Sequence, residues 1–92
     1  MDEISTGLAR TGKMFSNEWD FEEYGMKPDV VVVGKSLSGG MTPVSGILAD
    51  NHIMNTLKLG DHGSTYGGNP LGTAIAKEAL TVIVEEDLVS RS

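Results

Sequence analysis

A lysine at the end of an apolar run is the residue of this sequence best suited to chemistry. Four valines, Val30–Val33, lead through Gly34 to Lys35, and serines and glycines follow in "KSLSGG". A lysine beside glycines that cradle phosphate could hold a nucleotide. A lysine held away from water could instead act as an amine nucleophile, because desolvation favours the neutral amine. The surrounding residues have to distinguish these two kinds of site.

The letters GKS are the end of the nucleotide-binding pattern G-x-x-x-x-G-K-[ST]. That pattern needs a glycine where this sequence has Asp29. Its loop would be Val30–Val33, whose branched side chains obstruct the backbone N–H groups that bind phosphate. We therefore exclude a nucleotide loop, and two interpretations of Lys35 stay open. An isolated lysine usually extends its ammonium group into water. Here Gly34 and the glycines after Ser38 leave room for a flat group beside an amine that could form an imine with an aldehyde.

The segments around Lys35 predict an α/β fold. Val30–Val33 is β-branched and apolar on both faces, which is typical of a parallel-sheet strand covered on both sides. Residues 36–43 predict a turn-rich connection, and residues 44–49 a second strand. Residues 50–57 predict a short helix that Asp50 or Asn51 caps. Residues 14–24 combine aromatic and acidic side chains and predict a loop with partial helical character.

The dipeptide Asn69-Pro70 predicts the start of a long helix, with asparagine at the cap and proline at the first helical position. We expect this helix to span residues 70–86. Its apolar positions recur at helical spacing, which predicts a buried stripe of Leu71, Ile75, Ala79 and Val82. One such helix cannot cover both faces of the valine strand, so we expect the chain to be part of a larger layered sheet.

The composition indicates a small, acidic, folded unit. The 92 residues carry 13 acidic and 7 basic side chains, for a formal net charge of -6. This balance argues against a nucleic-acid surface, because phosphate neutralisation needs clustered lysine and arginine. The sequence has no cysteine, which excludes disulfides and thiolate metal sites. The longest purely apolar run is the valine run, far too short to span a membrane, and residues 1–7 lack the apolar centre of a secretion signal.

Several stretches together resemble one enzyme family. "DEISTGLARTG", "PDVVVVGKSLSGG", "TPVSGILAD" and "HGSTYGGNPLG" occur in the order found in the class III (fold-type I) pyridoxal-phosphate aminotransferases. Within this class the chain is most similar to the ornithine aminotransferases. The resemblance implies a three-layer αβα large domain with a mostly parallel sheet. It further implies that residues 1–92 are a fragment of that cofactor-binding domain, with the small domain and the N-terminal part absent.

The resemblance also implies roles for individual residues. Lys35 matches the lysine that forms the Schiff base with pyridoxal 5'-phosphate and then carries the proton between substrate and cofactor. Asp2 matches the carboxylate that keeps the pyridine nitrogen protonated, so that the ring can absorb electrons. Ile4 matches the aliphatic residue against one face of the ring. Ser64 and Thr65 match the pair that reaches the phosphate of the neighbouring subunit's cofactor in a homodimer.

Each of these assignments has a plainer alternative. Taken alone, Asp2 is a solvated acid near the terminus and Ile4 is a core residue. Ser64 and Thr65 could form a turn that bonds only its own backbone. The matched segments, rather than any single residue, therefore carry the assignment.

Other polar residues fall outside the family roles or depart from the family pattern. His62 lies in a turn without a partner acid at a defined spacing, so we interpret it as structural. Arg10 lies in a glycine-containing loop, and we interpret it as a surface or loop-pinning residue rather than a carboxylate clamp. Ser5 replaces a glutamine that usually contacts the cofactor's phenolic oxygen, although we keep it among the cofactor-binding residues. Thr42 replaces a more usual aromatic, and residues 13–27 look longer than is typical.

The function implied is transfer of the δ-amino group of L-ornithine to 2-oxoglutarate, which yields glutamate semialdehyde and glutamate. The implied partners are an amino donor, a 2-oxo acid and a second copy of the chain, with no metal, nucleic acid or membrane. Acetylornithine and 4-aminobutyrate aminotransferases share much of the pattern, so the donor stays open. The family occurs in the mitochondrial matrix and in the cytoplasm, and the sequence does not distinguish them. A rival interpretation is that the 92-residue chain alone is catalytically inert and aggregates through its uncovered valine strand.

Overall fold

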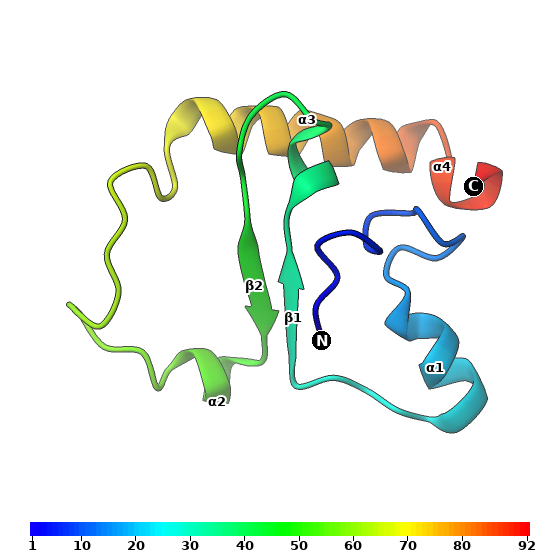
Figure 1. The fold of residues 1–92 in the computed structure, drawn as a ribbon, viewed down its shortest axis with the longest axis horizontal. Coiled ribbons are helices and arrows are strands. Elements are labelled where there is room, and N and C mark those ends of the chain that lie inside the picture. Colours follow the sequence, from blue (N-terminus) through cyan, green and yellow to red (C-terminus); the bar gives the residue numbers. More distant parts are fainter.

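One central strand organises the computed structural model, which describes residues 1–92. β1 (Val30–Val33) pairs with β2 (Gly46–Ala49) in an antiparallel ladder. On the other edge of β1, the amino-terminal segment runs parallel to it through a bridge between Asp2 and Val32. Figure 1 shows this order, with the amino terminus and β2 on opposite sides of β1. Both predicted strands are therefore confirmed, and the second begins two residues later than expected.

The connection between β1 and β2 carries Lys35. It begins with a single-turn 3-10 helix, η1 (Lys35–Ser38), where the sequence predicted only an irregular, turn-rich segment. Gly39 ends this turn with a φ of 64°, a left-handed conformation that glycine adopts without steric cost. Ser38 is buried, and its hydroxyl bonds the backbone of Thr42. The connection is thus more ordered than its glycine content suggested, because the hydrogen bonds of the buried Ser38 hydroxyl hold Thr42 close to it.

The remaining elements are helical. The long helix α3 begins and ends within one residue of the predicted span, whereas the short helix expected over residues 50–57 is a single turn. The aromatic and acidic stretch over residues 14–24 is helical over its last eight residues. A last helical turn near the carboxyl terminus was not predicted. The helices are α1 (Asn17–Tyr24), α2 (Asn51–Met54), α3 (Pro70–Glu85) and α4 (Leu88–Arg91).

The predicted cap of α3 is present. Asn69 Oδ1 accepts a hydrogen bond from Gly72 N at 2.7 Å, and Pro70 occupies the first helical position. At α2 the capping prediction is only half right. Asp50 occupies the N-cap position with an extended backbone, but its side chain makes no capping bond.

The predicted buried stripe of α3 is only partly confirmed, because Ile75, Ala79 and Val82 are partly buried and none of its four residues is fully buried. Leu71 is 69% exposed, and the buried residues of this helix are Gly72, Ala76 and Ile83. The reason is close packing at the start of the helix. A Cβ atom on Gly72 would lie 3.3 Å from Val44 Cγ2, so the backbone itself approaches its neighbour there. The prediction weighed large apolar residues and ignored the small residues that permit such contact.

The core is small and lies beside the sheet rather than over it. Leu8, Ala9 and Ile83 form its buried centre, and Leu37 and Leu88 are among the residues that pack against it. The helix α3 contacts η1 and α4 instead of covering the valine strand. No helix of the structure combines the length and the apolar character needed to cross a membrane.

The sequence predicted a valine strand covered on both faces, and this prediction is wrong for residues 1–92. Only Val33 is buried, and Val30, Val31 and Val32 are partly exposed. The β1–β2 pairing is antiparallel, and the Asp2–Val32 bridge is the parallel contact on the other edge. The α/β class therefore holds, whereas the expected layers on the two faces are not formed by residues 1–92.

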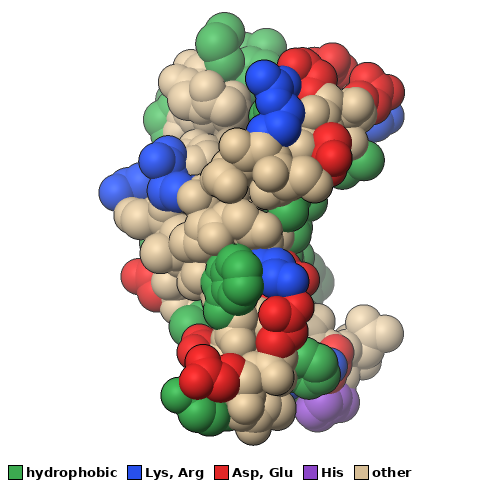
Figure 2. All heavy atoms as spheres, turned by 90° about the vertical axis from the view of Figure 1, so that its right-hand side faces the viewer, with side chains coloured by type: hydrophobic (Ala, Val, Ile, Leu, Met, Phe, Trp, Pro, Cys, Tyr) green, Lys and Arg blue, Asp and Glu red, His purple; other side chains and the backbone are tan.

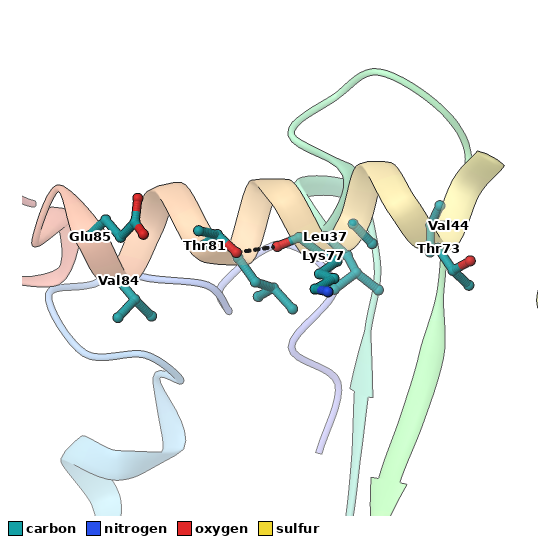
Figure 3. Close-up of a pocket in the computed structure, with 9 residues that line it drawn as sticks. Leu37, Val44, Thr73, Lys77, Thr81, Val84 and Glu85 are labelled. Atoms are coloured by element: carbon teal, nitrogen blue, oxygen red, sulfur yellow. Dashed lines mark hydrogen bonds between the residues drawn. The ribbon is translucent and has the colours of Figure 1, made fainter. Parts of the chain in front are cut away.

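Apolar surface is accordingly exposed along α3. A groove of about 640 Å³ on this helix is lined mainly by aliphatic side chains, among them Leu37, Val44 and Val84. Figure 3 shows Val84 near one end of this groove and Val44 near the other. Figure 2 shows the face that bears α1 and the carboxyl terminus, where hydrophobic side chains are exposed among acidic ones and basic side chains lie apart from one another.

Candidate functional site

Lys35 follows the end of β1. The last strand residue, Val33, is buried, and only Gly34 separates it from the lysine. Its backbone has a φ of 39°, which is in the left-handed region that residues other than glycine rarely adopt. Its side chain is exposed, and Nζ donates a hydrogen bond to Ser5 Oγ at 3.0 Å. Strained residues of this kind cluster at functional sites, where the surrounding structure holds them in place. The lysine singled out from the sequence therefore has an unusual backbone and one specific polar partner, but residues 1–92 do not hold it away from water as the nucleophile interpretation expected.

The amino-terminal turn places three predicted site residues beside that lysine. Asp2 pairs with β1, and its Oδ1 accepts a hydrogen bond from Ile4 N at 3.0 Å. Ile4 lies against the backbone that precedes the lysine, since its Cγ2 would be 3.4 Å from a Cβ atom on Gly34. Ser5 follows directly and accepts the lysine's hydrogen bond. Residues distant in the sequence thus meet at one end of β1.

Ser64 and Thr65 are not brought to this cluster. Both are exposed in the segment between α2 and α3, which Figure 1 places beyond β2 and away from the amino-terminal turn. The segment is compact where it approaches the helix, because a Cβ atom on Gly67 would lie 3.0 Å from Ser64 Cβ. Asn69 Nδ2 donates to Tyr66 O at 2.8 Å and so ties the segment to the cap of α3. His62 is exposed in the same segment.

An open hollow of about 660 Å³ lies beside Lys35. Lys35 and Arg10 are its two basic residues, and no acidic residue lines it. Arg10 was interpreted as a surface or loop residue, and it is exposed as expected. The structure adds that this arginine shares a hollow with the lysine, which the sequence spacing did not indicate. The rest of the lining is Ser36, Gly39, Gly40, Met41, Thr42 and Pro43. No cluster of histidine and carboxylate side chains is arranged to hold a metal ion.

Glu3 is the residue of this region that the sequence did not reveal. It is 1% exposed, the most buried acidic side chain of the molecule. Burial by itself would raise the pKa of this carboxyl. Hydrogen bonds from Thr6, Asn17 and Ser16 outweigh that effect and lower the pKa from an ordinary value of 4.5 to about 2. Glu3 is therefore an ionised carboxylate inside the protein.

The partners of Glu3 explain why it was missed. Ser16 and Asn17 lie at the start of α1, more than ten residues along the chain. Capping motifs in sequence link residues three apart, whereas this carboxylate accepts helix-start N–H groups from a separate segment. The only sequence signal is an acid beside Asp2 with a threonine three residues on, which is too common to be diagnostic.

Comparison with known proteins places these observations in a family. The profile described as Aminotransferase class-III matches residues 1–92. Ornithine aminotransferase of Emericella nidulans is 54% identical over 91 residues, which are 99% of this chain and 19% of that protein. The chain thus spans less than one fifth of the length of this relative.

Solved structures agree with the sequence matches. The ornithine aminotransferase of Toxoplasma gondii superposes with a TM-score of 0.89 at 48% identity, over 98% of this chain and 20% of that chain. That crystal structure is described as having partial occupancy of PLP at its active site. An acetylornithine aminotransferase from Elizabethkingia anophelis superposes with a TM-score of 0.85 at 49% identity, over 97% of this chain and 21% of that chain.

Proposed function

The chain belongs to the class III aminotransferase family, and we propose that it supplies the lysine and part of the cofactor site of a pyridoxal-phosphate-dependent aminotransferase. The observation that carries the proposal is the contact between Lys35 Nζ and Ser5 Oγ at 3.0 Å. It joins a strained lysine to the turn that holds Asp2 and Ile4. Amine, hydroxyl, carboxylate and aliphatic group are the chemical types that a phosphorylated pyridine aldehyde requires.

The residues at the end of β1 fit this cofactor in kind and in access. Lys35 is exposed and borders an open hollow, so an aldehyde can reach its amine. Gly34 leaves the backbone before it free of a side chain, and a Cβ atom there would lie 3.4 Å from Ile4 Cγ2 and 3.5 Å from Ser45 Cβ. When bound, pyridoxal phosphate supplies an electrophilic carbon and a ring that accepts electrons from the substrate.

Each side chain then has a distinct task. Lys35 binds the cofactor through Nζ and afterwards moves a proton at the substrate carbon as a general base. Ser5 orients Nζ through its hydroxyl. Asp2 holds a proton on the ring nitrogen, because a carboxylate stabilises the charged form of a base beside it. Ile4 covers an apolar face and excludes water from it.

Ser64 and Thr65 are proposed to bind the cofactor phosphate of a second copy of the chain. Their exposure and their position beyond β2 support this assignment, since they do not approach the Lys35 of their own chain. Hydroxyl and backbone N–H groups in a glycine-rich turn are suited to phosphate oxygens. The same proposal places residues 1–92 in the large, cofactor-binding domain of such an enzyme, with a mostly parallel three-layer sheet.

The proposed reaction is transfer of the δ-amino group of L-ornithine to 2-oxoglutarate. The 54% identity to an ornithine aminotransferase favours this donor. Acetylornithine is the second candidate, because an acetylornithine aminotransferase superposes nearly as well at 49% identity.

The test is chemical trapping of the lysine. The protein is mixed with pyridoxal phosphate, the adduct is reduced with borohydride, and the labelled peptide is mapped. We expect the label on Lys35, and we expect Lys35→Ala to abolish it while Lys77→Ala leaves it unchanged. Label spread evenly over the lysines would refute the proposal. With cofactor loaded, amino transfer from ornithine and from acetylornithine then distinguishes the two donors.

A further inference from the structure

Two adjacent acids at the amino terminus have opposite environments. Asp2 is exposed and belongs to the proposed cofactor site, whereas Glu3 is 1% exposed and has no part in that site. Successive side chains of an extended segment point to opposite sides. Whatever holds the Glu3 side chain therefore also determines the direction of Asp2.

Both carboxylate oxygens of Glu3 are fully engaged. Oε1 accepts from Ser16 N at 3.2 Å, from Ser16 Oγ at 2.8 Å and from Thr6 Oγ1. Oε2 accepts from Asn17 N and Asn17 Nδ2, each at 2.8 Å. The start of α1 thus directs two backbone N–H groups at this carboxylate, where the helix end also favours negative charge.

The backbone of Glu3 is fixed as tightly as its side chain. Its N–H donates to Val32 O at 2.9 Å, and its carbonyl accepts from Gly7 N at 2.9 Å. A Cβ atom on Gly7 would lie 2.8 Å from that carbonyl oxygen, so the turn closes without space for a side chain. Glu3 therefore joins β1, the following turn and α1 at one residue.

We propose that Glu3 is a positioning residue, whose carboxylate anchors the turn of residues 2–5 to the start of α1 and so sets the direction of Asp2 and Ser5 toward the cofactor. The inference rests on the proposed function, because it concerns the same site. It differs from a purely structural role in one respect. Loss of the anchor must change how the ring nitrogen is recognised, and not only how stable the protein is.

The experiment compares two ligands, pyridoxal phosphate and its deaza analogue, which has carbon in place of the ring nitrogen. Dissociation constants for both are measured by absorbance titration of the protein. Asp2→Asn keeps an oxygen for the Ile4 N–H but loses the charge, so it should reduce the preference for pyridoxal phosphate. Glu3→Gln places an amide NH2 against N–H donors and should reduce the same preference by about tenfold, the effect of one lost hydrogen bond to a charged group.

Two further variants separate positioning from stability. Asn17→Ala removes one donor to Glu3 but leaves the carboxylate, and it should lower the preference in the same direction if Glu3→Gln fails to fold. Ile83→Val is a core control, which should lower stability and leave the ratio of the two constants unchanged. Amide hydrogen exchange should accelerate at Glu3 and Ile4, and not within α3, in the Glu3→Gln protein.

The outcomes identify which claim fails. An unchanged ratio in Asp2→Asn would overturn the proposed role of Asp2 and, with it, this part of the proposed function. A reduced ratio in Asp2→Asn, with an unchanged ratio in both Glu3→Gln and Asn17→Ala, would overturn the positioning role alone. Equal loss of the ratio in Ile83→Val would show that Glu3 acts only through stability.

Discussion

Lys35 holds a backbone φ of 39° at the start of η1, where glycine would fit with less strain. A left-handed conformation costs an ordinary L-residue about 1–2 kcal/mol. We expect Lys35→Gly to raise the free energy of unfolding by about 1 kcal/mol while abolishing attachment of pyridoxal phosphate. Urea unfolding and borohydride labelling measure the two effects.

Lys35→Ala is the matched control, because alanine removes the amine and keeps a Cβ atom. It should lose cofactor attachment without the gain in stability. A gain equal to that of Lys35→Gly would show that the lysine side chain, rather than its backbone, is the source of strain.

Glu3 predicts a distinct dependence of stability on pH. Its folded pKa of about 2 lies below the ordinary 4.5, so the folded state prefers the ionised form. The resulting stabilisation is fully present above about pH 4.5 and is lost as the pH falls toward 2, and it amounts to about 3 kcal/mol. Urea unfolding at a series of pH values measures this loss.

The other acids of the chain also titrate in this range, so the informative quantity is the difference from Glu3→Gln. That difference should be largest near neutral pH and shrink as the pH falls. A difference that stays constant down to acid pH would mean that the carboxylate's ionisation is not what the hydrogen bonds stabilise.

At the scale of elements, Asn69 serves α3 and the preceding segment with different atoms. Oδ1 caps the helix by accepting from Gly72 N, and Nδ2 holds Tyr66 O. Asn69→Asp keeps the cap and loses the donor, whereas Asn69→Ala loses both. We expect Asn69→Ala to cost about 1 kcal/mol and Asn69→Asp to cost less, as measured by thermal unfolding.

The two variants should behave alike in a second measurement. Proteolysis of the segment between α2 and α3 should accelerate in both, because both lose the side-chain bond to Tyr66 O and keep only the longer backbone bond from residue 69. Faster cleavage in Asn69→Ala alone would mean that the cap, and not the contact with Tyr66, orders the residues around Ser64.

Local sequence signals predicted the elements whose causes are local. The asparagine and proline at the start of α3 determine its beginning, and the valine run determines β1, so both were found. α4 was missed because its residues Leu88 and Val89 pack against a core assembled from distant segments. The buried face of α3 was predicted only in part for the same reason, since Gly72 and Ala76 are buried by what they touch rather than by their hydrophobicity.

The candidate site divides in the same way. The resemblance pointed to Lys35 and to the turn beside it, and the structure brings Lys35, Ser5 and Ile4 close together. Nothing in the spacing indicated Glu3, since its partners are side chains and N–H groups of another segment. These groups reach Glu3 only because the fold brings residues 16 and 17 back beside the amino-terminal turn, and no short sequence pattern encodes that contact.

At the scale of the whole molecule, many large apolar side chains are exposed. Only 11 of 92 residues are buried, and Val84, which is 67% exposed, lines the groove on α3. Contiguous apolar surface promotes association. We expect the chain to associate with increasing concentration, and Val84→Glu to weaken this association in light scattering.

Leu59→Glu is the control for that substitution. Leu59 is fully exposed and does not line the groove on α3, so the same added charge should have little effect there. Equal weakening by both substitutions would show that net charge, rather than the groove, governs association.

The β1–β2 ladder ends with the pair Val33 and Gly46. Its position determines where this chain can tolerate insertions and deletions. The lysine follows the ladder after a single glycine, so an insertion there would turn the amine to the opposite side of the sheet. Residues 41–45, which lead back to β2, do not have this constraint, because they follow the lysine and do not determine its direction. Insertions and deletions over evolution should therefore accumulate in residues 41–45 and be rare between Val33 and Lys35.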